Sequence, residues 1–316
     1  MAGRPEGGAR GPGIAMTPLS RETIAARLAE AGYIADAELA TAVAMMQLLK
    51  RPLLLEGEAG VGKTEVAKAL AHVHGTELIR LQCYEGLDQS AALYEWNYQR
   101  QLLAIEAGKG RGAGAAAGSA GIGTVEAEIF SERYLLERPL LAAIRRATPP
   151  VLLIDEVDRA DEEFEAFLLE LLSDWQVSIP ELGVVKATAI PHVVLTSNGA
   201  RELSDALRRR CLYHYVDFPD VDREARIIMA RIPGAGAALS LQIARMVEGV
   251  RREDLRKAPG VAETLDWAAA LVGLDVTDLR ENPEIVHETM MCLIKTREDK
   301  ARMDRAVTER LLGRVA

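Results

Sequence analysis

Short apolar runs alternate with helically spaced segments over the first two thirds of the chain. The helical segments carry an apolar residue every three or four positions, as Leu39, Val43 and Met46 do. Between them lie candidate strands at Leu53–Leu55, Glu77–Gln82, Val151–Ile154, His192–Thr196 and Leu212–Val216. Short continuous apolar runs are typical of strands buried on both faces of a parallel sheet. The alternation therefore predicts an α/β fold with a parallel sheet covered on both sides.

Polar residues and glycines mark the ends of several predicted elements. Ser20 and Asp36 each precede a helical segment and carry side chains that cap helix N-termini, and Gly32 is suited to a C-terminus. The other elements predicted here are helices over Lys63–Val73 and Phe164–Leu172 and a hairpin over Val177–Ile190 with its turn at Gly183.

The pattern changes near Arg231, where Pro233–Gly236 is typical of a linker and no strand pattern follows. We therefore predict an α/β core over residues 17–230 and a smaller helical domain over residues 231–316. Residues 1–16, rich in Gly, Pro and Arg, are predicted to be a flexible tail. The Gly- and Ala-rich segment 108–123 is predicted to be a mobile insertion loop, because it offers little apolar surface to bury.

Composition narrows the class of protein. Hydrophobic residues make up 49% and charged residues 27% of 316 residues, which is ordinary for a globular protein. Lys and Arg total 38 against 47 Asp and Glu, a net charge of −9, which disfavours nucleic acid as the main partner. Three widely spaced cysteines favour a reducing cytoplasm over a disulfide framework. No apolar run approaches the ~18 residues that a membrane span needs.

The most informative motif follows the first apolar run and opens a helix. It fits the pattern G-x-x-x-x-G-K-[ST] with Gly57, Glu58, Ala59, Gly60, Val61, Gly62, Lys63 and Thr64. Such a loop wraps its N–H groups around phosphate at a helix N-terminus, the lysine reaches the β- and γ-phosphates, and the hydroxyl ligates Mg²⁺. The motif predicts a nucleoside triphosphate as the ligand, with Mg²⁺.

Two acids follow the Val151–Ile154 run, at the sheet edge where parallel strands present ligands. Asp155 is predicted to hold Mg²⁺, and Glu156 to orient and deprotonate the water that attacks the γ-phosphate. Asn198 follows the next strand, where it either holds that water or simply forms an Asn-Gly turn.

Three consecutive arginines, Arg208–Arg210, precede the last predicted strand of the core. Such a run is either a solvated face or a set of guanidinium groups presented to phosphate. Crowded arginines repel one another unless an anion is near, and the phosphate loop already supplies Lys63, so a further cation is most useful in trans. We therefore predict that Arg210, or failing that Arg209, reaches the γ-phosphate bound to a neighbouring subunit.

Taken together, these motifs resemble the AAA+ ATPases, and among them the MoxR branch. The resemblance rests on Gly57–Thr64, Leu152–Ala160, Val193–Asn198 and the arginine run, in this order and spacing. It implies a P-loop NTPase core with three αβα layers and sheet order 5-1-4-3-2, followed by an all-α lid domain. It further implies a ring hexamer, chaperone-like remodelling or metal-centre maturation, and a partner with a von Willebrand factor A domain.

Two local features refine the resemblance. The segment Leu81–Leu103 resembles the sub-branch that accompanies bacterial carbon monoxide dehydrogenase and related molybdenum enzymes. In the lid, MoxR proteins often carry a sensor 2 arginine where this chain reads Lys257-Ala258-Pro259-Gly260-Val261. Lys257 or Arg256 is the substitute that the sequence offers, so lid motion is expected to be transmitted differently.

The leading hypothesis is an ATP-hydrolysing, cytoplasmic remodeller that matures a client enzyme. A nucleic-acid motor or loader of the same fold is the first alternative, although the acidic balance disfavours it. A small-molecule kinase is the second, although such an enzyme has no need of Glu156, Asn198 and an arginine in trans together.

Overall fold

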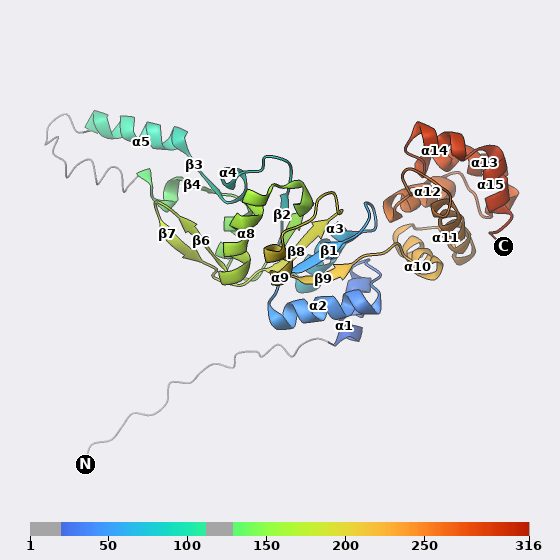
Figure 1. Ribbon diagram of the computed structural model, residues 1–316, viewed down its shortest axis with the longest axis horizontal. Coiled ribbons are helices and arrows are strands. Elements are labelled where there is room, and N and C mark those ends of the chain that lie inside the picture. The colour runs from blue at the N-terminus through green and yellow to red at the C-terminus, as the bar shows by residue number, and fades with distance from the viewer. Residues whose placement is uncertain (1–19, 112–128, 316) are drawn as a thin grey trace, which may run out of the picture.

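The computed structural model describes residues 20–111 and 129–315 (Figure 1). The predicted tail over residues 1–16 and most of the predicted loop over 108–123 lie outside these residues. Residues up to Arg111 instead continue a helix, so the start of that loop was predicted wrongly. Within the described residues, no helix combines the length and apolar character that crossing a bilayer requires.

A five-stranded parallel sheet forms the centre of the first unit. In spatial order its strands are β2 (Leu78–Gln82), β5 (Val151–Asp155), β8 (His192–Ser197), β1 (Leu53–Glu56) and β9 (Leu212–Tyr215). If these five strands are numbered along the chain, the order is 5-1-4-3-2. The sheet order implied by the sequence resemblance is therefore confirmed.

Helices cover both faces of this sheet because the strand side chains alternate between two cores. Leu53, Leu55 and Leu153 face one core, which includes α1 (Arg21–Glu30), α2 (Ala37–Leu49) and α3 (Lys63–His74). Leu54, Leu152 and Leu195 face the other, which includes α4 (Gln89–Ala92), α7 (Pro139–Arg145), α8 (Glu162–Asp174) and α9 (Asp205–Arg210). The predicted three-layer αβα architecture is confirmed.

Short polar side chains fix where these helices begin. The side chains of Ser20, Asp36 and Asp161 accept hydrogen bonds from backbone N–H groups in the first turns of α1, α2 and α8. This arrangement satisfies donors that have no partner inside a helix. The caps at Ser20 and Asp36 are those that the sequence indicated.

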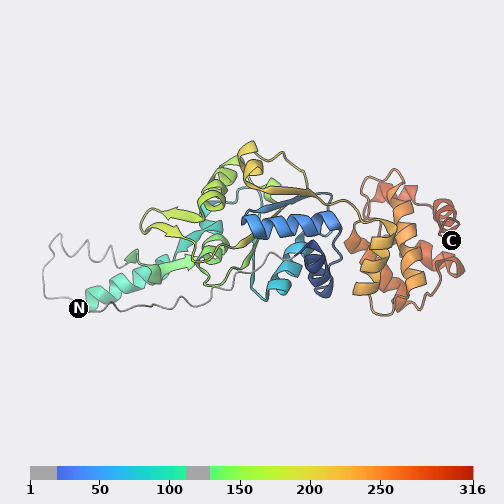
Figure 2. The same cartoon turned by 90° about the horizontal axis from the view of Figure 1, so that it is seen from below.

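Two small hairpins and one long helix extend from the sheet unit at the end away from the second unit (Figures 1 and 2). The β6–β7 hairpin confirms the hairpin predicted over Val177–Ile190, although it spans Gln176–Lys186 and its turn occupies residues 180–182, just before Gly183. Sequence reasoning missed the β3–β4 hairpin. These elements are β3 (Tyr94–Trp96), α5 (Tyr98–Arg111), η1 (Glu132–Tyr134), β4 (Leu135–Glu137), β6 (Gln176–Ile179) and β7 (Gly183–Lys186).

The second unit is a helical domain, the lid, packed around the fully buried Trp267. Ala225 and Ile228 of α10 belong to its core, so the lid begins at Val221 and not at residue 231, where the sequence pattern changes. Its elements are α10 (Val221–Arg231), α11 (Ala237–Arg251), α12 (Val261–Gly273), η3 (Leu279–Glu281), α13 (Pro283–Thr289), η4 (Met290–Cys292), α14 (Arg297–Arg302) and α15 (Arg305–Leu312).

Candidate functional site

The phosphate loop connects β1 to α3 and depends on glycine at several positions. Gly60 and Gly62 have φ of 83° and 98°, a region that other residues rarely adopt. Gly57 lies against Val216, the residue that follows the edge strand β9. A Cβ on Gly57 would stand 2.3 Å from the carbonyl oxygen of Val216. The glycines therefore let the loop both curve and sit against the neighbouring backbone.

Lys63 is the first residue of α3 and is only 7% exposed. Its Nζ donates to the carbonyl oxygens of Gly57, at 2.6 Å, and Glu58, at 2.8 Å. Burial lowers the pKa of its ammonium group, and the carboxylate of Asp158 opposes that shift. The ammonium group is thus held by the loop itself, at the place where the motif requires a phosphate contact.

Asp155 ends the interior strand β5 and is nearly fully buried. Its carboxylate accepts hydrogen bonds from Thr64 Oγ1 at 3.1 Å, Thr196 Oγ1 at 2.5 Å and Arg80 Nη2 at 2.5 Å. A hydroxyl and a carboxylate are oxygen donors of the kind that Mg²⁺ prefers. The contact between Thr64 and Asp155 therefore fits the predicted Mg²⁺ site.

Glu156 follows immediately and adopts the left-handed conformation with φ of 56°. Its N–H donates to Thr196 Oγ1 at 2.8 Å. Its carboxylate accepts from Gln82 Nε2 at 3.0 Å, Arg159 Nη1 at 3.2 Å and Asn198 Nδ2 at 3.4 Å. The structure thus brings together Glu156 and Asn198, the two residues assigned to the attacking water.

Asp158 holds the segment that carries Asn198. Its Oδ2 accepts from the backbone N–H of Asn198 at 3.1 Å and of Ala200 at 2.8 Å. Asp158 is 3% exposed, so these bonds are shielded from water. Sequence reasoning missed this role, because one more acid in an acidic segment is not a distinct signal.

Lys63, Thr64, Asp155, Glu156 and Asn198 line one open cavity of about 340 Å³, which we call the phosphate cavity. It lies at the carboxyl edge of the sheet and is closed on one side by the lid. Its lining is Ala59, Gly60, Gly62, Lys63, Thr64, Glu65, Arg80, Asp155, Glu156, Thr196, Asn198, Arg231, Val261, Ala262 and Leu265.

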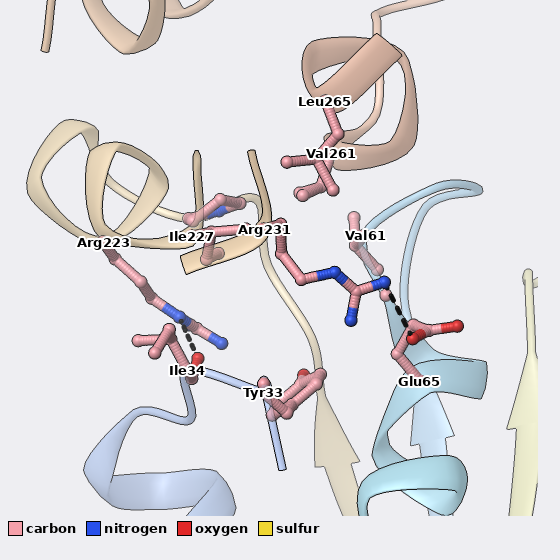
Figure 3. A pocket seen from close by; sticks show the side chains of 12 residues that line it. Tyr33, Ile34, Val61, Glu65, Arg223, Ile227, Arg231, Val261 and Leu265 are labelled. Carbon is pink, nitrogen blue, oxygen red and sulfur yellow. Dashed lines mark hydrogen bonds and ion pairs between the residues drawn. The ribbon is translucent and has the colours of Figure 1, made fainter. Parts of the chain in front are cut away.

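A second, mostly apolar pocket adjoins the phosphate cavity and shares Gly62, Glu65, Arg231, Val261 and Leu265 with it (Figure 3). We call it the apolar pocket. Its other lining residues are Gly32, Tyr33, Ile34, Val61, Pro219, Arg223 and Ile227. Sequence reasoning missed this pocket, because its walls come from four segments far apart in the chain.

Backbone and side-chain contacts join the lid to the core beside these cavities. The N–H of Val261 donates to the carbonyl oxygen of Gly60 at 2.9 Å. The guanidinium group of Arg223 donates to Ile34 O at 3.0 Å and Asp36 Oδ2 at 2.6 Å. Gly260 lies against Gly60 so closely that a Cβ on it would stand 2.7 Å from Gly60 Cα.

The residues considered as sensor 2 substitutes lie elsewhere. The Arg256 side chain is 72% exposed and approaches Glu298 at 4.0 Å, and the backbone N–H groups of Arg256 and Lys257 donate to Asp299. Neither residue lines the phosphate cavity or the apolar pocket.

The arginine run occupies α9 and lines neither cavity. Arg208 Nη2 lies 3.4 Å from Glu56 Oε2. Arg210 donates to Ser173 Oγ and, at 2.9 Å, to Ala206 O. Arg209 is exposed. The run therefore does not reach the phosphate cavity of its own chain.

Comparisons with known proteins find a matching family and several relatives. Residues 52–211 match the family model described as an AAA domain of the dynein-related subfamily. An uncharacterized protein of Staphylococcus epidermidis is 26% identical over 269 residues, which cover 82% of this chain and 89% of that protein. An uncharacterized protein of Staphylococcus aureus is 26% identical over 241 residues, covering 73% of this chain and 78% of that protein.

Among solved structures, a RuvB variant of Thermotoga maritima aligns with a TM-score of 0.45 and 19% identity. The alignment covers 83% of this chain and 69% of that chain.

The region matched by the family model takes in half of the chain and four of the five strands of the central sheet, all but β9. It includes the phosphate loop, the acids after β5, Asn198 and the arginines of α9. The chain therefore belongs to the AAA domain family, in its dynein-related subfamily, and is a member of the AAA+ ATPases.

Proposed function

We propose that this chain binds ATP with Mg²⁺ and hydrolyses it to ADP and phosphate. The observation that carries the proposal is the convergence of Lys63, the Thr64–Asp155 pair and the Glu156–Asn198 pair on one cavity. Lys63 leaves its two loop carbonyls for the phosphates. Thr64 and Asp155 would hold Mg²⁺, which neutralises phosphate charge.

Glu156 and Asn198 act on the attacking water. The Glu156 carboxylate accepts the proton of the water, while the Asn198 amide, 3.4 Å from that carboxylate, orients the water's oxygen. The apolar pocket suits the purine ring, because its walls are mostly hydrocarbon and it opens into the phosphate cavity.

We further propose that subunits assemble as a ring hexamer in which the α9 arginines act in trans. Arg209 is the better placed of the two candidates, since Arg210 is already bonded to Ser173 and Ala206. Large apolar side chains are exposed beside α9, on α2 and on the edge strand β9, which supports burial against a second copy: Leu48, Leu49, Tyr213 and Tyr215.

The resemblance to the MoxR branch supports a use for this hydrolysis. We propose that it drives remodelling of a protein client during the assembly or metal-cofactor maturation of an enzyme, with a molybdenum-containing dehydrogenase as the client class. A protein with a von Willebrand factor A domain is the proposed partner. Free, buried Cys83 and Cys211 support a cytoplasmic location, where thiols stay reduced.

Phosphate release from purified protein tests the enzymatic part. Wild type should release phosphate from ATP only when Mg²⁺ is present, and Lys63→Ala should abolish tight ATP binding in calorimetry. Stimulation by DNA would favour a nucleic-acid motor, and transfer of phosphate to a small acceptor would favour a kinase. Proteins recovered with the tagged chain from its native host, if held only by an ATP-trapping Glu156→Gln variant, would identify the client.

A further inference from the structure

The last residue of α10, Arg231, lies where the two cavities meet. It lines both the apolar pocket and the phosphate cavity. Its side chain runs past Gly32, where a Cβ would stand 3.7 Å from Nη1, and its guanidinium group points towards α3 (Figure 3). A nucleotide with its base in one cavity and its phosphates in the other must pass this residue.

Arg231 has a long, partly exposed contact with Glu65, which its side chain can leave. Its Nη2 lies 3.4 Å from Glu65 Oε2, and the side chain is 42% exposed. The other oxygen of Glu65 accepts from Lys68 Nζ at 2.5 Å. Because Lys68 keeps Glu65 neutralised, movement of Arg231 towards an anion strands no carboxylate.

No other cation from the described part of the lid takes this place. Arg223 lines only the apolar pocket and is bonded to Ile34 and Asp36. Arg256 and Lys257 line neither cavity, and glycine stands at residue 260. Among the described residues that line the phosphate cavity, Arg231 is the one cation that the lid contributes.

We propose that Arg231 is the lid residue that binds the nucleotide, through the phosphates next to the ribose. This inference rests on the proposed ATP-binding function and adds a residue to it. The position at the junction of the cavities assigns Arg231 to the α- and β-phosphates, which ATP and ADP share. The guanidinium group exchanges its 3.4 Å contact with Glu65 for charge-assisted hydrogen bonds to phosphate.

Calorimetric binding of Mg-ATP and Mg-ADP to the full chain tests this assignment. Arg231→Ala should weaken both nucleotides by a similar factor, on the order of tenfold or more. Arg231→Lys should recover only part of the affinity, because it keeps the charge and loses the planar fork. Arg226→Ala is the matched control, since Arg226 is exposed on the same helix and lines neither cavity.

Glu65→Gln separates phosphate binding from a tether between lid and core. If Arg231 binds phosphate, this variant releases it and removes a nearby negative charge, so affinity should rise. An equal loss of affinity in Glu65→Gln and Arg231→Ala would overturn the proposal in favour of a tether. Wild-type affinity in Arg231→Ala, or a loss for ATP alone, would also overturn it. A wild-type chain that binds neither nucleotide would instead overturn the proposed function.

Discussion

At the scale of single residues, the main charged groups of the site, Lys63, Asp155 and Glu156, each have hydrogen-bond partners within the protein. Lys63 rests on two loop carbonyls, Asp155 on Arg80 and two hydroxyls, and Glu156 on Gln82. Nucleotide and Mg²⁺, bound as we propose, would therefore replace existing contacts and not fill bare charges. This explains how so many ionisable groups are held close together beneath the lid.

Replacing Glu156 with glutamine should separate binding from hydrolysis. Glutamine keeps the shape and cannot accept a proton, so turnover should fall by about 10²–10⁴-fold while Mg-ATP still binds. Single-turnover phosphate release and calorimetry measure the two quantities. Asp155→Asn is the comparison, and it should raise the Mg²⁺ concentration needed for activity. Turnover within a few-fold of wild type in Glu156→Gln would remove this residue from the role of base.

A stacked histidine pair makes stability depend on pH. The rings of His74 and His192 lie 4.4 Å apart, and Gln47 Nε2 lies 3.1 Å from His74 Nε2. Burial, and then the charge of His74, lower the pKa of His192 to about 4. Burial, and then Arg27, lower the pKa of His74. In the folded state these two imidazoles therefore bind protons less readily than they do in the unfolded chain, where they become protonated below about pH 6.5.

Stability from this pair should be complete above about pH 6.5 and be lost as the pH falls towards 4. Urea unfolding near pH 7 and near pH 5 measures the loss. In His192→Phe the difference between the two pH values should shrink, since one titrating ring is gone. The control is His72→Phe, which lies on the same helix as His74 and outside the pair. An equal reduction in this variant would contradict the assignment of the pH dependence to the stacked pair.

At the scale of elements, the sequence was most informative where one physical signal dominates. Val151–Ile154 reads as a buried strand because it is uniformly apolar, and it forms the fully buried body of β5. The lid boundary was misplaced because helices occur in both units, and only the packing of Ala225 and Ile228 shows that α10 belongs to the lid. The strands β3 and β4 are too short to show a period.

The same reasoning applies to the site. Gly57–Thr64, Asp155 and Glu156 were predictable because loop curvature and strand ends constrain residue type locally. Arg80 lies on β2 and Arg231 on α10, and each reaches the cavity only through the tertiary fold. No local pattern marks an arginine at a strand or a helix end as a site residue.

The contact between α12 and the phosphate loop should not tolerate a side chain at residue 260. A Cβ on Gly260 would stand 2.7 Å from Gly60 Cα and 2.9 Å from Gly60 C, which are backbone atoms that cannot rotate away. Gly260→Ala should therefore displace the lid and weaken nucleotide binding about tenfold or more, with far-ultraviolet circular dichroism unchanged. Gly273→Ala, in the same helix with open space at its Cβ, is the control and should bind like wild type.

At the scale of the whole molecule, the arginines and the phosphate cavity of one chain do not meet, so activity should depend on assembly. Arg209→Ala subunits keep a complete nucleotide cavity, and Lys63→Ala subunits keep the arginines. Mixed rings should regain part of the activity that neither variant has alone. Some interfaces then pair an intact nucleotide site on one subunit with an unsubstituted arginine on its neighbour. Loss of an arginine of this kind costs on the order of 10³–10⁵ in rate.

Phosphate release from mixtures, with co-assembly checked by light scattering, measures this recovery. The same mixture with Arg210→Ala distinguishes the two arginines. Co-assembled mixtures that remain as inactive as the separate variants would place the arginine's action within its own chain.

The edge strand β9 has a consequence for how a ring would coordinate its sites. It begins directly after the arginines of α9, is in register with β1 through Glu56 and Tyr215, and leads through Val216 into α10. A paired strand is a stiff rod that neither stretches nor folds as a loop does. In a ring of the proposed kind, a shift of the arginines towards a neighbouring subunit would be coupled through β9 to the subunit's own lid. Engagement of the arginines at one nucleotide site and movement of the lid at the next site would then be coupled through this strand.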